Sequence, residues 1–442
     1  MLITIIGAGW NGCHLACELS ELGYQIILID RESQIFAGTS GLFGIRLHRG
    51  ATLRTNSFDH FREKYRGLVF EHEFSIYANG LVDSENFPSK VSDDTFHKVC
   101  MEYRGCKKVD PAVHCLDGIS SAYELDEPSV AIGSCARSWF ENKLEKARVS
   151  VILDTTVLHI KQAAIPNKTK PTISITIQQN KTAGEKTKVR HSTFLTDVAI
   201  NCTGFHEFVP KAISDPTSPI YFEYTYQVCL ALRFRDNRPT SNKPVSFTCM
   251  DGWFPCLMPA ISDTKDSMKP QRDYILTHGA YTILGSFSTL DKAHHLLSNT
   301  LTDEIVAANI CGPAESEMRR FWPEFSCRFT YEGWYGTVLA KPKCPTEFRS
   351  GFTFEHQGVI HVFPGKVSNV IDVFNEVITL LRTKDVTSVS SDLILQDRGF
   401  RFLAGGVFHN GLSELQKRAL KNDRSTSSLQ TLDRILGRVQ EE

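Results

Sequence analysis

The feature that most constrains this chain is the hexapeptide GAGWNG at positions 7–12, which follows the apolar, β-branched run LITII at positions 2–6. Its glycines fit the pattern GxGxxG. Positions 10–22 then carry helix formers with leucines on one face, and positions 24–29 (YQIILI) are a continuous apolar run, typical of a strand buried on both faces. The order of strand, glycine-rich turn, helix and strand predicts one βαβ unit.

Each glycine has a role of its own in a cradle for a dinucleotide. Gly7 permits the tight turn, Gly9 lets a pyrophosphate approach the backbone, and Gly12 lets the helix pack closely on the strand. The helix N-terminus directs N–H groups at the phosphates. Asp30 ends the second strand, 18 residues after Gly12, where an acid accepts hydrogen bonds from ribose hydroxyls. The pattern predicts a bound dinucleotide rather than a structural turn, and leaves NAD and FAD open.

Composition narrows the class of protein. At 442 residues the chain is too long for one compact core, so we expect two domains or more. A net charge of −1 gives no reason to expect nucleic acid or an anionic membrane as a partner. The N-terminus lacks the features of a signal peptide, and no apolar run approaches the roughly 20 residues that span a bilayer. We therefore expect a cytoplasmic protein. The 13 cysteines form no cluster at zinc spacing, which predicts reduced thiols and no metal site.

Three later segments favour FAD over NAD. After Asp30 the chain enters a loop of small residues, GTSG at 38–41, where an NAD enzyme would continue with the next strand and helix. DVAINCTG at 197–204 predicts a distant buried strand that stops at a glycine. VIHVFPG at 359–365 predicts another strand, and the amphipathic helix that follows at 367–383 can direct its N-terminus at an anion. In a flavin, that anion would be the N1–C2=O region.

On these residues the chain resembles the D-amino-acid oxidase (DAO) superfamily of FAD-dependent oxidoreductases. The match covers roughly residues 1–55, 195–205 and 325–380, and RLHRG at 46–50 resembles an R-x-H-x-G run of one subgroup. The resemblance implies an α/β fold of the glutathione-reductase type, with a discontinuous Rossmann-like FAD-binding domain and a second, β-rich α+β substrate domain. One departure is that PGKVSNV stands where the family usually carries G-x-G-G-x-G.

The two expected domains alternate along the chain. We expect FAD-binding segments at 1–55, 131–215 and 326–385, substrate-domain segments at 56–130 and 216–325, and a helical C-terminal appendage at 386–442. The expected FAD-binding residues are Gly7, Gly9, Trp10, Asn11, Gly12, Asp30, Arg31, Thr39, Ser40, Gly41, Arg46, Val157, Thr203, Gly204, Gly365, Val367, Ser368 and Asn369.

The resemblance also places a small-molecule substrate against the flavin, beneath the β-rich domain. The candidate catalytic residues are Arg46, His48, Tyr335 and Arg349. Arg349 precedes VIHVFPG by ten residues, near the position at which amino-acid oxidases carry an arginine that binds a carboxylate. The alternatives are that Arg46 forms a structural ion pair, that Arg349 is a surface strand arginine, and that His48 is a flavin-loop or core histidine. Two further aromatic residues either line the pocket or belong to the core, namely Tyr226 and Tyr281.

Three functions remain open at this point. The first is hydride transfer to flavin N5 from a C–N substrate such as an amine, an amino acid or an amino-sugar-like metabolite. The second is an FAD-dependent monooxygenase, against which stand the lack of a second GxGxxG for a nicotinamide and of a G-D-A-x-H-like segment. The third is a flavoprotein with an isomerising or structural role. The oligomeric state is open.

Overall fold

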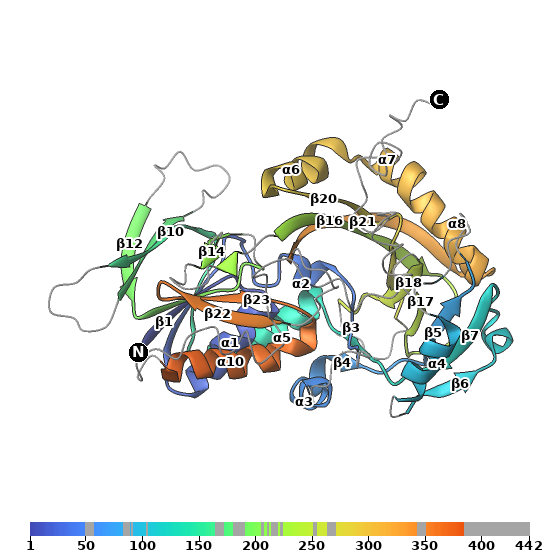
Figure 1. Ribbon diagram of the computed structural model, residues 1–442, viewed down its shortest axis with the longest axis horizontal. Helices are drawn as coiled ribbons and strands as arrows, with labels where there is room; N and C mark the ends of the chain where they lie inside the picture. The colour runs from blue at the N-terminus through green and yellow to red at the C-terminus, as the bar shows by residue number, and fades with distance from the viewer. Residues whose placement is uncertain are drawn as a thin grey trace.

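Figure 1 shows the computed structural model of the chain, in which two large sheets lie side by side and each has its own helices. The structure describes residues 1–48, 57–82, 89, 92–102, 105–163, 172–179, 191–204, 207–209, 212–213, 220–221, 224–250, 254–262, 271–342 and 351–383. Arg349 and the appendage expected at 386–442 lie outside these residues.

The first sheet is built around the opening strand of the chain. β1 (Leu2–Ile6) pairs in parallel with β2 on one side and β13 on the other, and it is buried along nearly its whole length. A parallel strand covered on both faces needs the continuous apolar run that the sequence has there. The strand order is β22 (Phe352–His356), β23 (Val359–Phe363), β13 (Val198–Asn201), β1, β2 (Gln25–Ile29) and β9 (Ser150–Ile152).

Helices cover one face of this sheet and a smaller sheet covers the other (Figure 1). The helices are α1 (Trp10–Glu21), α5 (Gly133–Lys146) and α10 (Val370–Thr383). The small sheet is antiparallel and consists of β10 (Thr155–Ala163), β11 (Thr172–Gln179) and β12 (His191–Thr196). Ile173 and Ile175 of β11 pack against Ile6, Ile29 and Ala199 of the first sheet. This arrangement confirms the predicted Rossmann-like domain.

The second large sheet has nine strands. Their order is β20 (Ile283–Phe287), β16 (Tyr224–Asp236), β19 (Asp273–His278), β18 (Pro255–Pro259), β17 (Val245–Met250), β5 (Phe74–Gly80), β7 (Ile119–Glu124) and β6 (Lys107–Val109), with β21 (Phe329–Pro342) paired to β16. Four helices pack on one face, namely α6 (Leu290–His295), α7 (Asp303–Val306), α8 (Gly312–Phe321) and α9 (Phe325–Arg328). This sheet confirms the predicted β-rich second domain.

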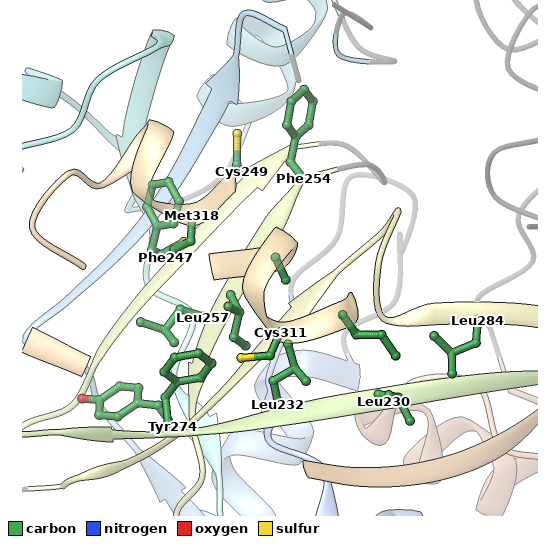
Figure 2. Close-up of a cluster of buried hydrophobic side chains, with 14 of the residues drawn as sticks. Leu230, Leu232, Phe247, Cys249, Phe254, Leu257, Tyr274, Leu284, Cys311 and Met318 are labelled. Atoms are coloured by element: carbon green, nitrogen blue, oxygen red, sulfur yellow. The ribbon is translucent and has the colours of Figure 1, made fainter. Parts of the chain in front are cut away.

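An apolar core joins the nine-stranded sheet to these helices. Figure 2 shows Leu230 and Leu232 of β16 in this core together with Leu257 of β18 and Met318 of α8. Because successive side chains of a strand point to opposite faces, the residues between these apolar positions face the other way. That second face is turned toward the FAD-binding domain, and polar side chains gather on it.

Short elements connect the two domains. A three-stranded sheet of β3 (Ile45–Arg46), β8 (Ser129–Val130) and β4 (Val69–Phe70) lies between them. The remaining described α-helices and strands are α2 (Thr39–Leu42), α3 (Ser57–Lys64), α4 (Asp93–Met101), β14 (Ala212–Ile213) and β15 (Ile220–Tyr221).

The strand β21 lies in a different place from the one that the sequence suggested. The sequence predicts that residues 326–385 belong to the FAD-binding domain, yet β21 pairs with β16 from Phe329 to Pro342, inside the nine-stranded sheet. Its long antiparallel ladder with β16 is a non-local pairing that the local sequence does not report. In the described chain, the third FAD-binding segment therefore begins at β22.

Candidate functional site

The turn after β1 has no room for side chains. Gly7 has φ of +100°, a conformation that L side chains rarely adopt, and a Cβ on it would lie 2.6 Å from the carbonyl oxygen of Cys202. A Cβ on Gly12 would lie 1.8 Å from the carbonyl oxygen of Gly7. Both glycines are therefore required by close packing of the turn on α1 and on the end of β13, as the sequence predicted.

The N-terminus of α1 faces the loop of small residues. Gly9 is the N-cap of α1 and makes no side-chain cap, and a Cβ on it would lie 2.9 Å from Oγ of Ser40. The backbone N–H of Trp10 donates to the same oxygen over 3.3 Å. Asn11 is 8% exposed, and its Oδ1 has no hydrogen-bond partner among the described residues. The helix therefore presents backbone donors and one buried amide at the place where phosphates are expected.

Asp30 lies at the carboxyl end of β2, beside this turn. Its Oδ2 accepts from the backbone N–H of Ala8 over 2.5 Å, and its Oδ1 accepts from the N–H of Glu32 over 2.9 Å. These bonds fix the carboxylate next to the glycine turn, where a ribose is expected. Arg31 is half-exposed and forms an ion pair with Glu207 at 2.8 Å.

The loop of small residues connects the two domains. Gly41 in α2 is tightly enclosed, because a Cβ on it would lie 1.8 Å from the carbonyl oxygen of Phe36. The hydroxyl of Thr39 lies 2.6 Å from that of Thr337 on β21. This hydrogen bond joins the FAD-binding domain to the nine-stranded sheet.

The end of β13 carries two further predicted residues. The hydroxyl and the backbone N–H of Thr203 both donate to Oδ1 of Asn201, over 2.7 and 3.1 Å, and Gly204 has φ of +75°. Val157 is buried in the apolar layer between the first sheet and β11, so its side chain serves the core.

The last predicted cofactor segment precedes α10. Gly365 has φ of +54°, and the N–H of Lys366 donates to Oδ1 of Asn369 over 2.8 Å. Val367, Ser368 and Asn369 form a short 3₁₀ turn that leads into the helix. The side chains of Ser368 and Asn369 are buried. A helix N-terminus therefore stands at this edge of the sheet despite the altered glycine motif.

The residues of the cradle fit FAD. A Cβ on Gly7, Gly9 or Gly12 would lie 2.6, 2.9 or 1.8 Å from a neighbouring atom, so the backbone at the turn stays bare; the buried amide oxygen of Asn11 lacks a partner in the described chain, and Asp30 lies beside the turn, where a ribose is expected. The 38–41 loop and the Gly365 turn extend the predicted FAD site from the glycine turn toward the second sheet.

A buried polar cluster lies where the two domains meet. Arg46 on β3 forms an ion pair with Glu127, with 3.1 Å between Nε and Oε2, and both side chains are almost fully excluded from solvent. Its Nη1 donates to the hydroxyl of Thr248 on β17 over 2.6 Å, and its guanidinium lies 4.2 Å from the ring centroid of Tyr77 on β5. Nη2 is also buried and has no hydrogen-bond partner among the described residues.

His48 belongs to the same cluster. Its Nδ1 lies 2.7 Å from the hydroxyl of Tyr77 and 3.2 Å from Oε2 of Glu127. Burial lowers the pKa of His48 to about 4, the charge of Lys366 adds to this shift, and Glu127 opposes it. His48 is therefore neutral at pH 7. Burial, with the neighbouring Glu127 carboxylate, raises the pKa of Tyr77 well above its usual value, so Tyr77 keeps its proton.

The cluster continues as one row across the nine-stranded sheet. The row consists of directly opposed residues on five neighbouring strands, namely Tyr123, Tyr77, Thr248, Cys256 and Thr277. Thr248 and Cys256 are in hydrogen-bonding contact at 3.1 Å. The row places hydroxyl and thiol groups side by side on the face that is turned toward the FAD-binding domain.

Of the three predicted catalytic residues that the structure describes, two lie together. Arg46 and His48 both contact Glu127. Tyr335 lies elsewhere, with the guanidinium carbon of Arg233 above its ring, 5.1 Å from the ring centroid. Tyr335 and Arg233 line a separate cavity of about 70 Å³ that Gly41 and Leu42 also line.

The other candidate residues lie elsewhere. Arg349 is outside the described residues. Tyr226 is buried in the core on the helix-covered face, and Tyr281 packs against that core, which agrees with the structural alternative given for both.

Sequence reasoning missed Tyr77, Glu127, Thr248 and Cys256. None of them lies in a recognisable motif, because each comes from a separate part of the chain and their contacts depend on strand pairing. In the part of the chain that the structure describes, no three His, Cys, Asp or Glu side chains form a group that could hold a metal ion. None of the described helices is long and apolar enough to span a membrane.

Comparison with known proteins agrees with this geometry. Residues 3–95 match the family model "FAD dependent oxidoreductase" (DAO). The chain is 43% identical over 438 residues to the FAD-dependent monooxygenase kojA of Aspergillus flavus, and the match covers 97% of this chain and 96% of that protein.

Solved structures share the fold at low sequence identity. L-α-glycerophosphate oxidase from Mycoplasma pneumoniae, solved with FAD bound, is 11% identical with a TM-score of 0.59, over 86% of this chain and 95% of that one. Glycine oxidase from Geobacillus kaustophilus is 10% identical with a TM-score of 0.58, over 92% and 99%. The cradle, the fold and the relative of nearly equal length lead to one assignment. The chain belongs to the DAO family of FAD-dependent oxidoreductases, and FAD is its cofactor.

Proposed function

We propose that this enzyme oxidises a small polar substrate at a carbon that bears nitrogen, in an amine, an amino acid or an amino-sugar-like compound. When bound, FAD supplies the hydride acceptor for such a reaction. The observation that carries the proposal is the buried cluster of Arg46, Glu127, Tyr77 and His48 on the sheet face that is turned toward the FAD-binding domain.

His48 is suited to hold a proton. A C–N substrate must lose its ammonium proton before oxidation, and a neutral imidazole can accept that proton. Nδ1 of His48 is already engaged by Tyr77 and Glu127, so Nε2 is the ring nitrogen that remains to accept a proton. We therefore assign proton acceptance to Nε2 of His48, with Nδ1 held by Glu127.

Arg46 is suited to orient the substrate. Its Nε and Nη1 are engaged by Glu127 and Thr248, which leaves the buried Nη2 as a donor for a substrate oxygen. Because Glu127 neutralises the guanidinium, Arg46 alone gives no net positive charge for binding a carboxylate. This favours amines and amino-sugar-like compounds over simple amino acids.

The experiment is anaerobic reduction of the purified yellow holoenzyme by a panel of amines, amino acids and amino sugars without a nicotinamide nucleotide. We expect one class to bleach the flavin absorbance, and we expect His48→Gln to slow the bleaching at least tenfold while FAD stays bound. If no C–N compound bleaches the flavin, the proposal is wrong.

A second candidate is an FAD-dependent monooxygenase, and the name of the 43% identical relative favours it. Such an enzyme takes its electrons from an external reductant, commonly NADPH. Rapid anaerobic bleaching by NADPH, followed by incorporation of oxygen from O₂ into a product, would select this candidate. No bleaching by either route would favour a non-oxidative role.

A further inference from the structure

A second cavity lies where the two domains meet. Its volume is about 70 Å³, and Gly41, Leu42 and Ile132 line it from the side of the FAD-binding domain. Residues of β16, β19 and β21 line it from the side of the nine-stranded sheet. Neither Arg46 nor Glu127 is among the lining residues, so this cavity is separate from the candidate active site.

Arg233 on β16 supplies the cavity with a cation. Its guanidinium carbon lies over the ring of Tyr335 on β21, 5.1 Å from the ring centroid. Arg233 is partly buried, and in the described chain its side chain makes no ion pair and no hydrogen bond. Contact with an aromatic ring uses none of the N–H donors of a guanidinium, and these donors match the geometry of a carboxylate. Arg233 is therefore positioned and available to bind an anion.

The charges around Arg233 limit that anion to one negative charge. Two acidic residues also line the cavity, Asp273 and Glu332. Glu332 forms an ion pair with Arg235 at 3.6 Å, and Asp273 is opposed to Arg235 in the ladder of β16 and β19. The four side chains together carry no net charge. A monoanion can pair with Arg233, whereas a dianion such as phosphate would also be repelled by the two carboxylates.

The size and the remaining lining of the cavity indicate a small molecule with an apolar part. One water occupies about 10–15 Å³ of such a space, so the cavity holds roughly five non-hydrogen atoms. The buried side chains of Ile132 and Ile275 line it together with that of Leu42. A carboxylate with a short apolar tail has this size and this combination of surfaces.

We propose that the cavity beside Arg233 is a second binding site, and that it takes a short-chain monocarboxylate such as propionate. The carboxylate accepts hydrogen bonds from the guanidinium of Arg233, and the tail packs against Ile132 and Ile275. Tyr335, which the sequence predicts as a catalytic residue, here acts as a positioning residue that supports the guanidinium. The inference does not depend on the proposed oxidation of a C–N substrate.

The test is titration of the purified holoenzyme with sodium propionate at constant ionic strength, followed by saturation-transfer NMR of the propionate methyl signal. We expect saturable binding, and no binding of propionamide, which has the same shape without the charge. Arg233→Met should raise the Kd for propionate at least about tenfold, because charge-assisted hydrogen bonds are lost. Arg235→Met is the matched control, since Arg235 lies on the same strand, is 48% exposed and does not line the cavity. It should bind propionate nearly as well as the parent protein.

Two further measurements separate binding from folding. Tyr335→Leu keeps the cation but removes the ring beneath it, and it should weaken propionate binding while FAD stays bound. In the parent protein, propionate should slow the modification of Arg233 by phenylglyoxal but not that of Arg235, as followed by mass spectrometry. The proposal is wrong if propionate shows no saturable binding, if propionamide binds equally well, if Arg233→Met leaves the Kd unchanged, or if propionate does not protect Arg233.

Discussion

The carboxylate of Glu127 lies 3.1 Å from Nε of Arg46, and neither side chain is more than 2% exposed. Pairing of β3 with β8 brings them together, because Arg46 is opposed to Ser129 in that ladder. Two opposite charges in this position satisfy each other, and neither can be removed without leaving the other buried and unpaired. The Arg46–Glu127 pair therefore stabilises the junction of the two domains and is also part of the candidate active site.

Glu127→Gln should destabilise the protein strongly. Removing one partner of a buried ion pair costs about 3–5 kcal/mol of unfolding free energy. Urea unfolding of the holoenzyme at pH 7 measures the change. The matched control is Glu71→Gln, since Glu71 pairs with Arg62 at the surface and is 48% exposed, where a pair contributes about 1 kcal/mol or less. Equal effects of the two variants would contradict the assignment.

Gly9→Ala should weaken FAD binding. Its Cβ would lie 2.9 Å from Oγ of Ser40, so the loop that faces α1 must shift. We expect at least a tenfold increase in the Kd for FAD, about 1.4 kcal/mol, measured by titrating the apoprotein. Gly312→Ala in α8 is the control, because it lies outside the FAD-binding domain and a Cβ there would make only an ordinary contact of 3.6 Å, and it should bind FAD normally. A normal affinity for Gly9→Ala would mean that the cradle does not hold the phosphates.

The acidic limb of the kcat profile should lie near pH 4. The base form of His48 is the neutral form, and its pKa is lowered from 6.5 to about 4, so His48 stays competent as pH falls through 6 and 5. Turnover is measured from pH 7 down to pH 4, with return to pH 7 to exclude unfolding. A limb near pH 6.5 that disappears in His48→Gln would show that His48 is not held in the neutral form.

Stability should fall as the solution is acidified. Burial lowers the pKa of His14 to about 3, whereas an unfolded histidine titrates near 6.5, so below pH 6.5 the unfolded state binds the extra proton. The stability that the protein gains by keeping His14 neutral is complete above pH 6.5. It is lost between pH 6.5 and about 3, at about 1.4 kcal/mol per pH unit. His14→Gln should flatten the slope of unfolding free energy against pH by that amount. His60→Gln, at an exposed position, should leave it unchanged.

The cradle was predictable because its determinants are local. Gly7, Gly12 and Asp30 lie in one βαβ unit, and the close approach of backbone to backbone that excludes side chains is visible as a glycine pattern. The buried apolar runs of β1 and β13 were predictable for the same reason. Hydrophobic periodicity and turn chemistry depend on residues only a few positions apart, so a single sequence is enough to predict them.

The polar row was not predictable, because it exists only across strands. Tyr77 and Thr248 become neighbours through the parallel pairing of β5 with β17, and Glu127 approaches Arg46 through β8. Register between strands far apart in the chain has no signature in either strand alone. Tyr335 lies apart from Arg46 and His48 for a related reason: β21 pairs with β16, and this places the tyrosine ring beneath the guanidinium of Arg233.

The central position of β1 in its sheet affects how the chain can fold during translation. β1 and β2 are made close together, but β13 comes only at residues 198–201 and its neighbour β23 at residues 359–363. The helix that packs on α1, α10, follows later still, at residues 370–383. Until residues 198–201 have been made, β1 therefore has an open edge, and until residues 370–383 have been made, α1 lacks the helix that packs on it, the condition in which nascent chains aggregate. We expect the newly made N-terminal segment to rely on chaperones until the last strands leave the exit tunnel.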